Sequence, residues 1–244
     1  MIDLHCHILP ALDDGAVDLE DSVAMARQAE DDGIEIVCAT PHIRSDHDVQ
    51  VDELEGRIEA VNRELERQGV AVRVVPGGEV ADEAIEAVTD EKLRCVSLGG
   101  TGTWLLVEPR PGPITGELVD TVDHLVGRGY RCVIAHPERH AGADFRERLE
   151  ALVERGALIQ VTAALIAGGP ASPVLIELAG HGLVHLLGSD AHSARAGRPV
   201  RLSEGLARLA QVDCVKAHLD WVVSEGPRAI LAGEATAPPF LPRR

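Results

Sequence analysis

The chain has 244 residues and a formal net charge of −17, and 45% of its residues are hydrophobic but only 2% aromatic. This composition argues against intrinsic disorder and predicts an aliphatic core, while the negative charge disfavours nucleic acid or an anionic membrane surface as a partner. No apolar run reaches the ~20 residues of a membrane span, and the first residues lack a signal-peptide pattern. We therefore expect no membrane insertion and a cytoplasmic location.

Short apolar runs alternate with helical patterns along the whole chain. The runs are continuous rather than alternating, which is typical of buried parallel strands. The expected strands are residues 2–6, 35–39, 72–75, 104–107, 131–135, 157–161 and 184–187. The expected helices are residues 19–32, 51–68, 81–89, 115–128, 144–155, 173–180, 202–209, 212–225 and 227–232. This α/β order predicts a parallel sheet, either open or closed as a barrel, in a single domain over residues 1–244 with a coil at 235–244.

Histidines and carboxylates gather where the expected strands end. The candidates are His5, His7, Asp14, His42, Glu79, Glu108, His136, Asp190 and His192. Because the C-terminal ends of parallel strands share one rim, we expect these side chains to meet at a single mouth. Imidazole and carboxylate ligands without thiolate suit Mn²⁺, Fe or Zn²⁺. Nine ligands are too many for one ion and predict two or three ions that share a bridging carboxylate.

Such a cluster of ions would change the charge of the mouth. Four carboxylates contribute about −4 and three divalent ions about +6, so the site would be near +2 and would attract a phosphate despite the acidic surface. The ions would also lower the pKa of a bridging water and so produce a hydroxide nucleophile. For the other histidines we expect structural roles, although a role at the rim stays open for His47 and His140.

Several segments resemble one known family. They are His5-Cys6-His7, Asp13-Asp14-Gly15, Thr40-Pro41-His42, Gly78-Glu79, Val107-Glu108, Ala135-His136-Pro137-Glu138-Arg139 and Ser189-Asp190-Ala191-His192. Together they resemble the polymerase-and-histidinol-phosphatase (PHP) superfamily. More narrowly, they resemble the bacterial manganese-dependent protein-tyrosine phosphatases of capsule and exopolysaccharide clusters, the CpsB/YwqE type. The resemblance covers nearly the whole chain and implies a distorted (β/α)7 barrel with three Mn²⁺ at the C-terminal rim of the strands.

The resemblance also implies how the ligands are shared among the ions. The first ion would be held by His5, His7, Glu79 and Asp190. The second would be held by Glu79 as a bridge, Glu108 and His136. The third would be held by Asp14, His42 and His192.

Two arginines are implied to bind the substrate phosphate. Arg139 matches the family arginine that contacts phosphate, and Arg198 is our choice for a second one, with Arg195 as the alternative. The implied activity is hydrolysis of phosphotyrosine on protein, in the regulation of polysaccharide biosynthesis and export. The implied partner is the tyrosine-rich tail of a membrane-associated bacterial tyrosine kinase. The sequence identifies no general acid.

Three alternatives compete with this interpretation. Residues 38–45 fit the Cys-x5-Arg-Ser pattern of cysteine-dependent phosphatases, but this segment has no glycine, Pro41 removes a backbone donor, and Cys38 lies in an apolar strand. The same metal chemistry could serve a small phosphate monoester such as histidinol phosphate, because the fold does not select the substrate. A non-catalytic metal-binding regulatory module is the third alternative, and the complete ligand set with Arg139 argues against it.

Overall fold

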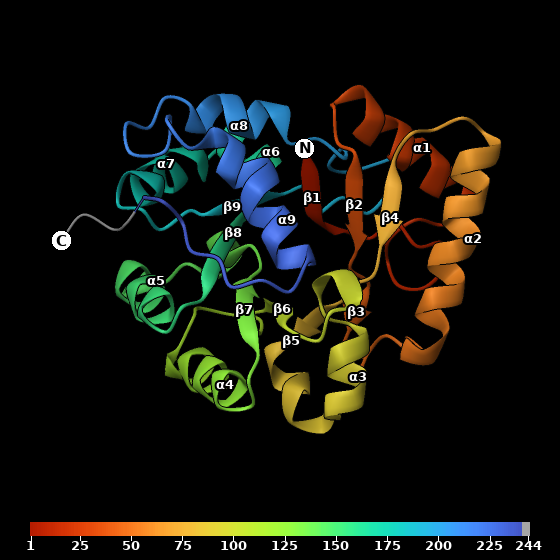
Figure 1. The fold of residues 1–244 in the computed structure, drawn as a ribbon. Helices are drawn as coiled ribbons and strands as arrows, with labels where there is room; N and C mark the ends of the chain where they lie inside the picture. The colour runs from red at the N-terminus through yellow and green to blue at the C-terminus, as the bar shows by residue number, and fades with distance from the viewer. Residues whose placement is uncertain (241–244) are drawn as a thin grey trace.

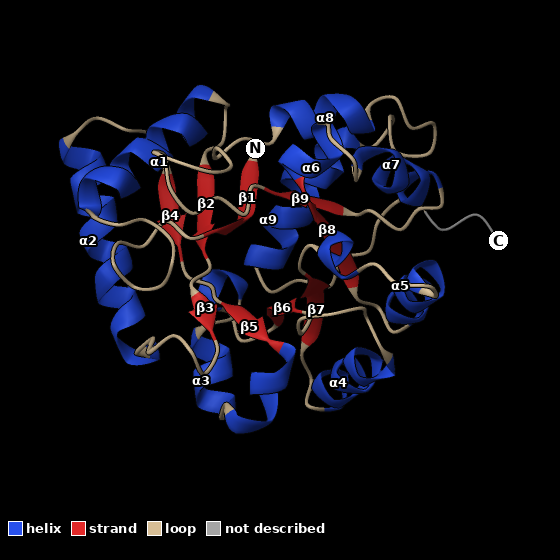
Figure 2. Ribbon diagram, turned by 180° about the vertical axis from the view of Figure 1, so that it is seen from behind, coloured by secondary structure: helices blue, strands red, loops and turns tan. Residues whose placement is uncertain are grey.

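The strands surround a common centre and the helices lie outside them (Figures 1 and 2). The computed structural model describes residues 1–240. One hydrogen-bonded group of strands has the order β1 (Ile2–Cys6), β2 (Ile36–Ala39) and β4 (Arg73–Val75). The other has the order β3 (His42–Ile43), β5 (Glu79–Ala81), β6 (Trp104–Glu108), β7 (Arg131–Ile134), β8 (Leu158–Thr162) and β9 (Leu186–Gly188). All of these pairs are parallel.

Two observations join the groups into a barrel. A parallel bridge between Cys6 and Ala191 connects the end of β1 to the segment that follows β9. In addition, β3 and β5 continue the chain paths of β2 and β4 after interruptions of only two and three residues. The strands of the described part of the chain therefore occupy seven positions in a ring, which confirms the predicted distorted (β/α)7 barrel.

The interruptions in two barrel strands have a local cause. Pro41 and Pro76 lie in them, and proline has no N–H to donate to a neighbouring strand. His42 and Glu79, which we predict to follow their strands, instead begin β3 and β5 and are register partners. This correction places both side chains on the barrel wall rather than on loops.

Most predicted helices are present. They are α1 (Leu19–Asp31), α2 (Leu54–Arg67), α4 (Gly116–Gly127), α5 (Phe145–Glu154), α7 (Ser172–Gly180), α8 (Ser203–Leu209) and α9 (Gly226–Leu231). In α2 the buried residues Leu54, Ile58, Val61 and Leu65 recur every three or four positions, so one apolar stripe faces the barrel. The stripe explains why the sequence pattern is sufficient to predict this helix.

Other helical predictions are wrong or incomplete. Residues 81–89 contain a 3₁₀ helix, Asp82–Ala87, in place of an α-helix. Residues 212–225 form turns and then a short π-helix, Trp221–Glu225. The sequence pattern does not predict α3 (Asp90–Cys95) or α6 (Ala163–Ala167). These helices have six and five residues, which are too few to establish a helical hydrophobic period.

The end of the barrel where the strands begin is covered by the last part of the chain. Helix α9 packs against β1 and the 3₁₀ turn Leu98–Gly100, and it lies in front of the strands in Figure 1. Gly99 has a φ of 76°, and a Cβ atom there would overlap the Leu231 carbonyl, so this contact requires glycine. The opposite end, where the strands finish, is left for a site.

The C-terminal segment, residues 235–244, is predicted to be a coil. Residues 235–240 contain no helix or strand, and Phe240 is buried beside Trp221. The rest of the predicted coil, residues 241–244, lies outside the described residues, and the single-domain assignment stays a prediction.

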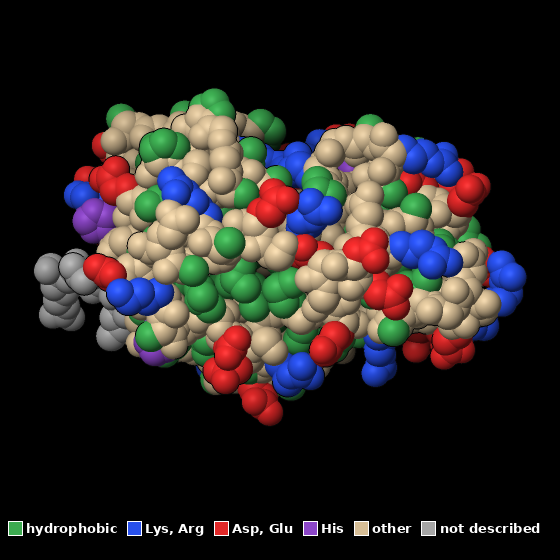
Figure 3. Space-filling model, turned by 90° about the horizontal axis from the view of Figure 1, so that it is seen from above, with side chains coloured by type: hydrophobic (Ala, Val, Ile, Leu, Met, Phe, Trp, Pro, Cys, Tyr) green, Lys and Arg blue, Asp and Glu red, His purple; other side chains and the backbone are tan. Residues whose placement is uncertain are grey.

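Among the described helices, none has the length and apolar character needed to cross a membrane. On the face drawn in Figure 3, acidic and basic side chains are interspersed.

Candidate metal centre

The structure brings all nine predicted ligand side chains together at the C-terminal end of the barrel. They form four overlapping groups whose candidate ligand atoms lie within 4.8 Å of one another. The groups are His7–Asp14–His42–His192, His5–His136–Asp190, His5–His7–Glu79 and His42–Glu79–Glu108. Because neighbouring groups share members, the arrangement suits several cations side by side rather than one isolated ion.

Glu79 lies at the centre of the cluster and is fully buried. Its Oε2 is 3.3 Å from Nε2 of both His5 and His7 and 3.1 Å from His42 Nδ1, whereas its Oε1 is 2.7 Å from His136 Nε2. Burial by itself raises the pKa of this carboxyl, but attraction to His5, a hydrogen bond with His136 and the proximity of His42 hold the pKa well below its usual range. Two oxygens that face different histidines are the geometry that a bridging ligand needs.

The histidines of the cluster differ in their electrostatic surroundings. Burial disfavours the charged form of His42, but the nearby carboxylates of Glu108 and Glu79 outweigh burial and raise its pKa to about 10. Burial together with repulsion from His7 lowers the pKa of His192 to about 3. The same cluster therefore favours the charged form of one histidine and the neutral form of another.

Several polar atoms of the centre are buried without a hydrogen-bond partner. They are His42 Nδ1, Glu79 Oε2, His136 Nδ1 and Asp190 Oδ1. Each unsatisfied buried polar atom costs about 1–3 kcal/mol, and proteins rarely retain them without a reason. His136 and Asp190 also have positive φ angles, 29° and 49°, and such strain concentrates at functional sites. Nitrogen and oxygen atoms of this kind fit divalent cations, which would satisfy them.

Two residues that the sequence analysis does not single out hold the histidine rings. Asp13 Oδ2 accepts a hydrogen bond from His7 Nδ1 (2.8 Å) and another from the backbone N–H of His42 (2.9 Å). Gln160 Oε1 lies 2.9 Å from His5 Nδ1. Such partners fix which ring nitrogen faces a metal. The available signals were the doubled aspartate of the Asp13-Asp14 turn and the single polar residue inside the apolar run of β8.

Arginines line the cleft above the centre, which has a volume of about 460 Å³. Its lining residues are Asp14, His42, Arg44, Glu108, Arg139, His192, Gly197 and Arg198. Arg139 and Arg198 both pair with Asp190 Oδ2, Arg198 at 3.0 Å. Arg195 pairs with Asp18 on the surface and does not line the cleft, which favours Arg198 over the alternative. The sequence analysis does not identify Arg44 as a cleft residue.

Helix α1 holds the loop that carries Arg198. Asp21 is fully buried, and its carboxylate accepts hydrogen bonds from Ser193 Oγ (2.8 Å) and Ala194 N–H (3.0 Å). Gln28 Oε1 accepts a hydrogen bond from Val200 N–H (3.1 Å). The loop is therefore tied to α1 on both sides of Arg198, and this sets the position of the guanidinium over the cleft.

The remaining sequence candidates lie outside the ligand groups. The His47 ring stacks on His42 with 5.2 Å between centroids, and His140 Nδ1 lies 3.0 Å from the Gly112 carbonyl. Cys38 is buried, and burial raises the pKa of its thiol to about 12. The Cys38 thiol donates to the Pro76 carbonyl, while Arg44 pairs with Asp46. This geometry disfavours the cysteine-phosphatase alternative, because a thiolate would not form near neutral pH.

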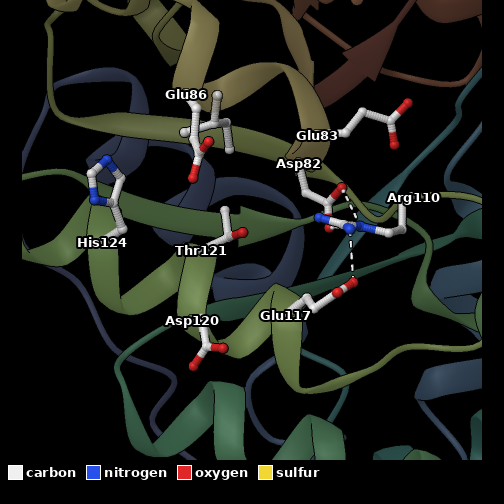
Figure 4. Close-up of a pocket in the computed structure, with 9 residues that line it drawn as sticks. Asp82, Glu83, Glu86, Arg110, Glu117, Asp120, Thr121 and His124 are labelled. Atoms are coloured by element: carbon white, nitrogen blue, oxygen red, sulfur yellow. Dashed lines mark hydrogen bonds and ion pairs between the residues drawn. The ribbon is translucent and has the colours of Figure 1, made fainter.

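A hollow of about 480 Å³ beside α4 has a different character. It is lined by Asp82, Glu83, Ile85, Glu86, Arg110, Glu117, Asp120, Thr121 and His124. Figure 4 shows Arg110 between two carboxylates: its Nε is 3.1 Å from both oxygens of Asp82, and its Nη1 is 2.7 Å from Glu117 Oε2. None of the residues that line this hollow has a buried side-chain polar atom without a hydrogen-bond partner, so the hollow is a weaker candidate site than the cleft above the ligand cluster.

Comparisons with known proteins agree with this geometry. YwqE, a tyrosine-protein phosphatase of Bacillus subtilis strain 168, is 35% identical over 204 residues, which cover 80% of this chain and 78% of YwqE. CapC of Staphylococcus aureus is 27% identical over 211 residues, covering 84% of this chain and 81% of CapC. A solved structure from work on YwqE and on CpsB of Streptococcus pneumoniae, described as unique metal-dependent tyrosine phosphatases, aligns over the whole of both chains with a TM-score of 0.83 and 29% identity.

A family model provides the broadest match. The model described as capsular polysaccharide synthesis, CpsB/CapC, matches residues 1–232 and so includes every residue of the cleft. The matched range covers nearly the whole chain, as the sequence resemblance does. The chain belongs to the CpsB/CapC family of capsular polysaccharide synthesis.

Proposed function

We propose that this chain is a metal-dependent phosphatase that hydrolyses phosphotyrosine in proteins. The observation that carries the proposal is the placement of Arg139 and Arg198 over a cluster of buried ligand atoms that lack partners. Arginine binds phosphate oxygens through paired N–H groups, and converging imidazole and carboxylate atoms without partners are the ligand types that divalent cations bind. Membership in a family that includes named tyrosine-protein phosphatases supports phosphotyrosine as the substrate.

We propose that three divalent ions share the nine ligand side chains, divided among the ions as the family resemblance implies. In the structure the candidate atoms group differently at two points, because His42 lies with Glu79 and Glu108, and His136 lies with His5 and Asp190. We propose His5, His7, Glu79 and Asp190 for the first ion, Glu79, Glu108 and His136 for the second, and Asp14, His42 and His192 for the third. We propose Mn²⁺ for all three, and Fe or Zn²⁺ would suit the same ligand types. When bound, the ions would supply an activated water and would stabilise negative charge on the phosphate oxygens.

Side chains of the protein would bind the phosphate group and hold the histidine rings in position. Arg139 and Arg198 would release the outer oxygen of Asp190 and bind the phosphate oxygens instead, which orients phosphorus toward the ligand cluster. Asp13 and Gln160 keep the rings of His7 and His5 in place during this exchange. The phenolate that leaves has a free pKa of ~10, so it requires less help from a proton donor than a serine alkoxide would.

The cellular setting is part of the same proposal. The tyrosine-rich tail of a membrane-associated bacterial tyrosine kinase is the proposed partner, and control of polysaccharide biosynthesis and export is the proposed role. Both rest on the family and on the residues that match it. A cytoplasmic location stays a prediction from the sequence.

Metal removal and substrate profiling test the proposal together. The purified protein is analysed for metals, treated with a chelator and dialysed, and then supplied separately with Mn²⁺, Zn²⁺ and Fe²⁺. We expect chelation to abolish phosphate release from a phosphotyrosine peptide and Mn²⁺ to restore it. Activity that survives complete metal removal would overturn the metal-dependent mechanism. A kcat/KM for histidinol phosphate above that for phosphotyrosine peptides would instead support the small-monoester alternative.

A further inference from the structure

A small apolar hollow adjoins the cleft on the same end of the barrel. It has a volume of about 270 Å³ and is lined by Ile43, Arg44, Ser45, Glu83, Ala84, Ala87 and Val88. Arg44 lines both this hollow and the cleft, so the two spaces are neighbours. Ala87 is exposed and Ala84 and Val88 are partly exposed, which leaves the apolar wall accessible from solvent.

The walls of the hollow are direct extensions of two strands that carry candidate metal ligands. Ile43 follows His42 in β3, and successive residues of a strand point to opposite faces. The other wall belongs to the 3₁₀ helix Asp82–Ala87, which begins immediately after β5 and therefore three residues beyond Glu79. Because β3 and β5 pair with each other, the hollow is held at a fixed position relative to the cleft.

Arg44 forms the boundary between the two spaces. Its guanidinium makes two hydrogen bonds of 2.6 Å with Asp46, and its Nη1 is 3.5 Å from Glu108 Oε2. With the charged end held in this way, the aliphatic stem can serve as an apolar surface for a ligand that passes from one space to the other. A small phosphate monoester would occupy the cleft without reaching the hollow. In a polypeptide substrate, by contrast, the residues next to the phosphotyrosine must cross the rim of the cleft.

We infer that the hollow binds an apolar side chain of the substrate polypeptide, one or two residues away from the phosphotyrosine. This inference rests on the proposed function and adds a preference for sequence around the phosphorylated residue. The occupant is the substrate itself because the hollow adjoins the cleft, with Arg44 lining both, and because alanine and valine line the hollow. Burial of one aliphatic side chain would favour such a peptide by roughly tenfold in kcat/KM.

A peptide series with matched variants tests the inference. Phosphotyrosine peptides in a Gly-Ser background carry a single Leu or Ser at each of the two positions on either side of the phosphotyrosine. With the Mn²⁺-loaded enzyme we expect Leu to be preferred over Ser by about tenfold at one position. The same preference is expected in the Kd of non-hydrolysable phosphonate peptides, measured by fluorescence anisotropy.

Substitutions at the exposed Ala87 separate apolar binding from electrostatics. Both Ala87→Glu and Ala87→Lys should reduce the preference for Leu to nearly one, because each introduces a polar chain into the hollow. The matched control is Ala60→Glu, an exposed alanine on the outer helix α2, which should retain the preference. If Ala87→Glu lowers the preference for Leu but Ala87→Lys raises it, the effect comes from the charge at this position rather than from apolar binding. That result would overturn the inference.

The remaining outcomes distinguish this inference from the proposed function. Equal hydrolysis of all peptides, or a preference for Leu that survives both Ala87 variants, overturns the inference and leaves the phosphatase proposal intact. Absence of phosphotyrosine hydrolysis by the Mn²⁺-loaded enzyme overturns both. A preference at one position that is lost in both Ala87 variants and kept in Ala60→Glu supports both.

Discussion

The cleft at the strand ends and the hollow around Arg110 are almost equal in volume, about 460 and 480 Å³, and both are lined by charged residues. They differ in how those charges are satisfied. In the hollow, both oxygens of Asp82 accept hydrogen bonds from Arg110, which also reaches Glu117. In the ligand cluster beneath the cleft, atoms such as Glu79 Oε2 and Asp190 Oδ1 lack hydrogen-bond partners. A charged concavity is therefore weak evidence of function, whereas converging unpaired ligand atoms are strong evidence.

The difference arises from how the side chains are anchored. Around Arg110, Glu117 is a long exposed side chain at the start of α4 that is free to turn toward its partner. In the cluster, Glu79 and His42 project from paired strands, and Asp13 holds the His7 ring. Rigid anchoring prevents these groups from pairing fully with one another, which keeps ligand atoms available for cations.

We expect the largest loss of metal and activity when a central carboxylate of the ligand cluster is removed, and no loss when a carboxylate of the Arg110 hollow is removed. Glu79→Ala should lose more than one equivalent of metal because its two oxygens face different ligand groups, and Asp14→Ala should lose mainly one. Since each ion supplies several kcal/mol of stabilisation, activity of Glu79→Ala should fall by roughly 10³-fold or more. Glu117→Ala, in the Arg110 hollow, is the control and should retain both metal and activity. Equal metal loss from the Glu79 and Asp14 variants, measured by mass spectrometry of metals, would refute the bridging role.

The second largest effect on kcat/KM is expected for an arginine of the cleft, compared with the arginine of the other hollow. Arg139→Ala should keep full metal content while kcat/KM falls by roughly 10²–10³-fold, as expected for the loss of a charged donor to the transition state. Arg139→Lys should restore activity only in part, because an ammonium group cannot form the bidentate fork. Arg110→Ala should retain kcat/KM. Wild-type kinetics for Arg139→Ala on a phosphotyrosine peptide would remove this residue from the mechanism.

A smaller effect is expected where α1 anchors the loop of Arg198. Asp21→Ala removes the acceptor for Ser193 and Ala194, so KM should rise by about tenfold with a smaller change in kcat. Glu20→Ala, at the neighbouring exposed position, should behave like the wild type. In an Arg198→Ala background the Asp21 substitution should add little, because both changes disturb one interaction. Fully additive effects in this double-mutant cycle would show that Asp21 does not act through Arg198.

The smallest effect on activity is expected for His185, a buried group whose ring is fully paired. Its Nδ1 accepts from Ile159 N–H and its Nε2 lies 2.9 Å from the Gly182 carbonyl, and burial lowers its pKa from 6.5 to about 4. Because the folded pKa lies below the unfolded value, the stability contribution is complete above pH 6.5 and is lost as the pH falls toward 4.

Urea unfolding at several pH values measures this contribution. The free energy of unfolding should fall by on the order of 3 kcal/mol across that pH window in the wild type, relative to His185→Gln. The activity of His185→Gln at pH 7 should match the wild type. An identical pH dependence of stability in the two proteins would show that His185 does not titrate in this range.

Sequence patterns predict the regular parts of this barrel well and its irregular parts poorly. Helix α2 is predicted because its buried residues repeat at helical spacing. By contrast, α3 and α6 are too short to show a period, and the helix expected at residues 212–225 forms turns and a π-helix instead. The breaks that separate β3 and β5 from the strands before them contain proline, yet the pattern alone does not show that the chain re-enters the barrel after each break.

The sequence by itself determined which residue types stand at the ends of the strands, because parallel strands deliver their C-terminal ends to one rim whatever the details of packing. All nine candidate ligands could therefore be named before the fold was known. Only the tertiary structure decided that Glu79 faces several histidines at once, that Asp13 and Gln160 hold two of the rings, and that Arg198 rather than Arg195 reaches the cleft. Those properties depend on contacts between segments far apart in the chain, such as the hydrogen bonds of Asp21 to Ser193 and Ala194, which local sequence patterns do not encode.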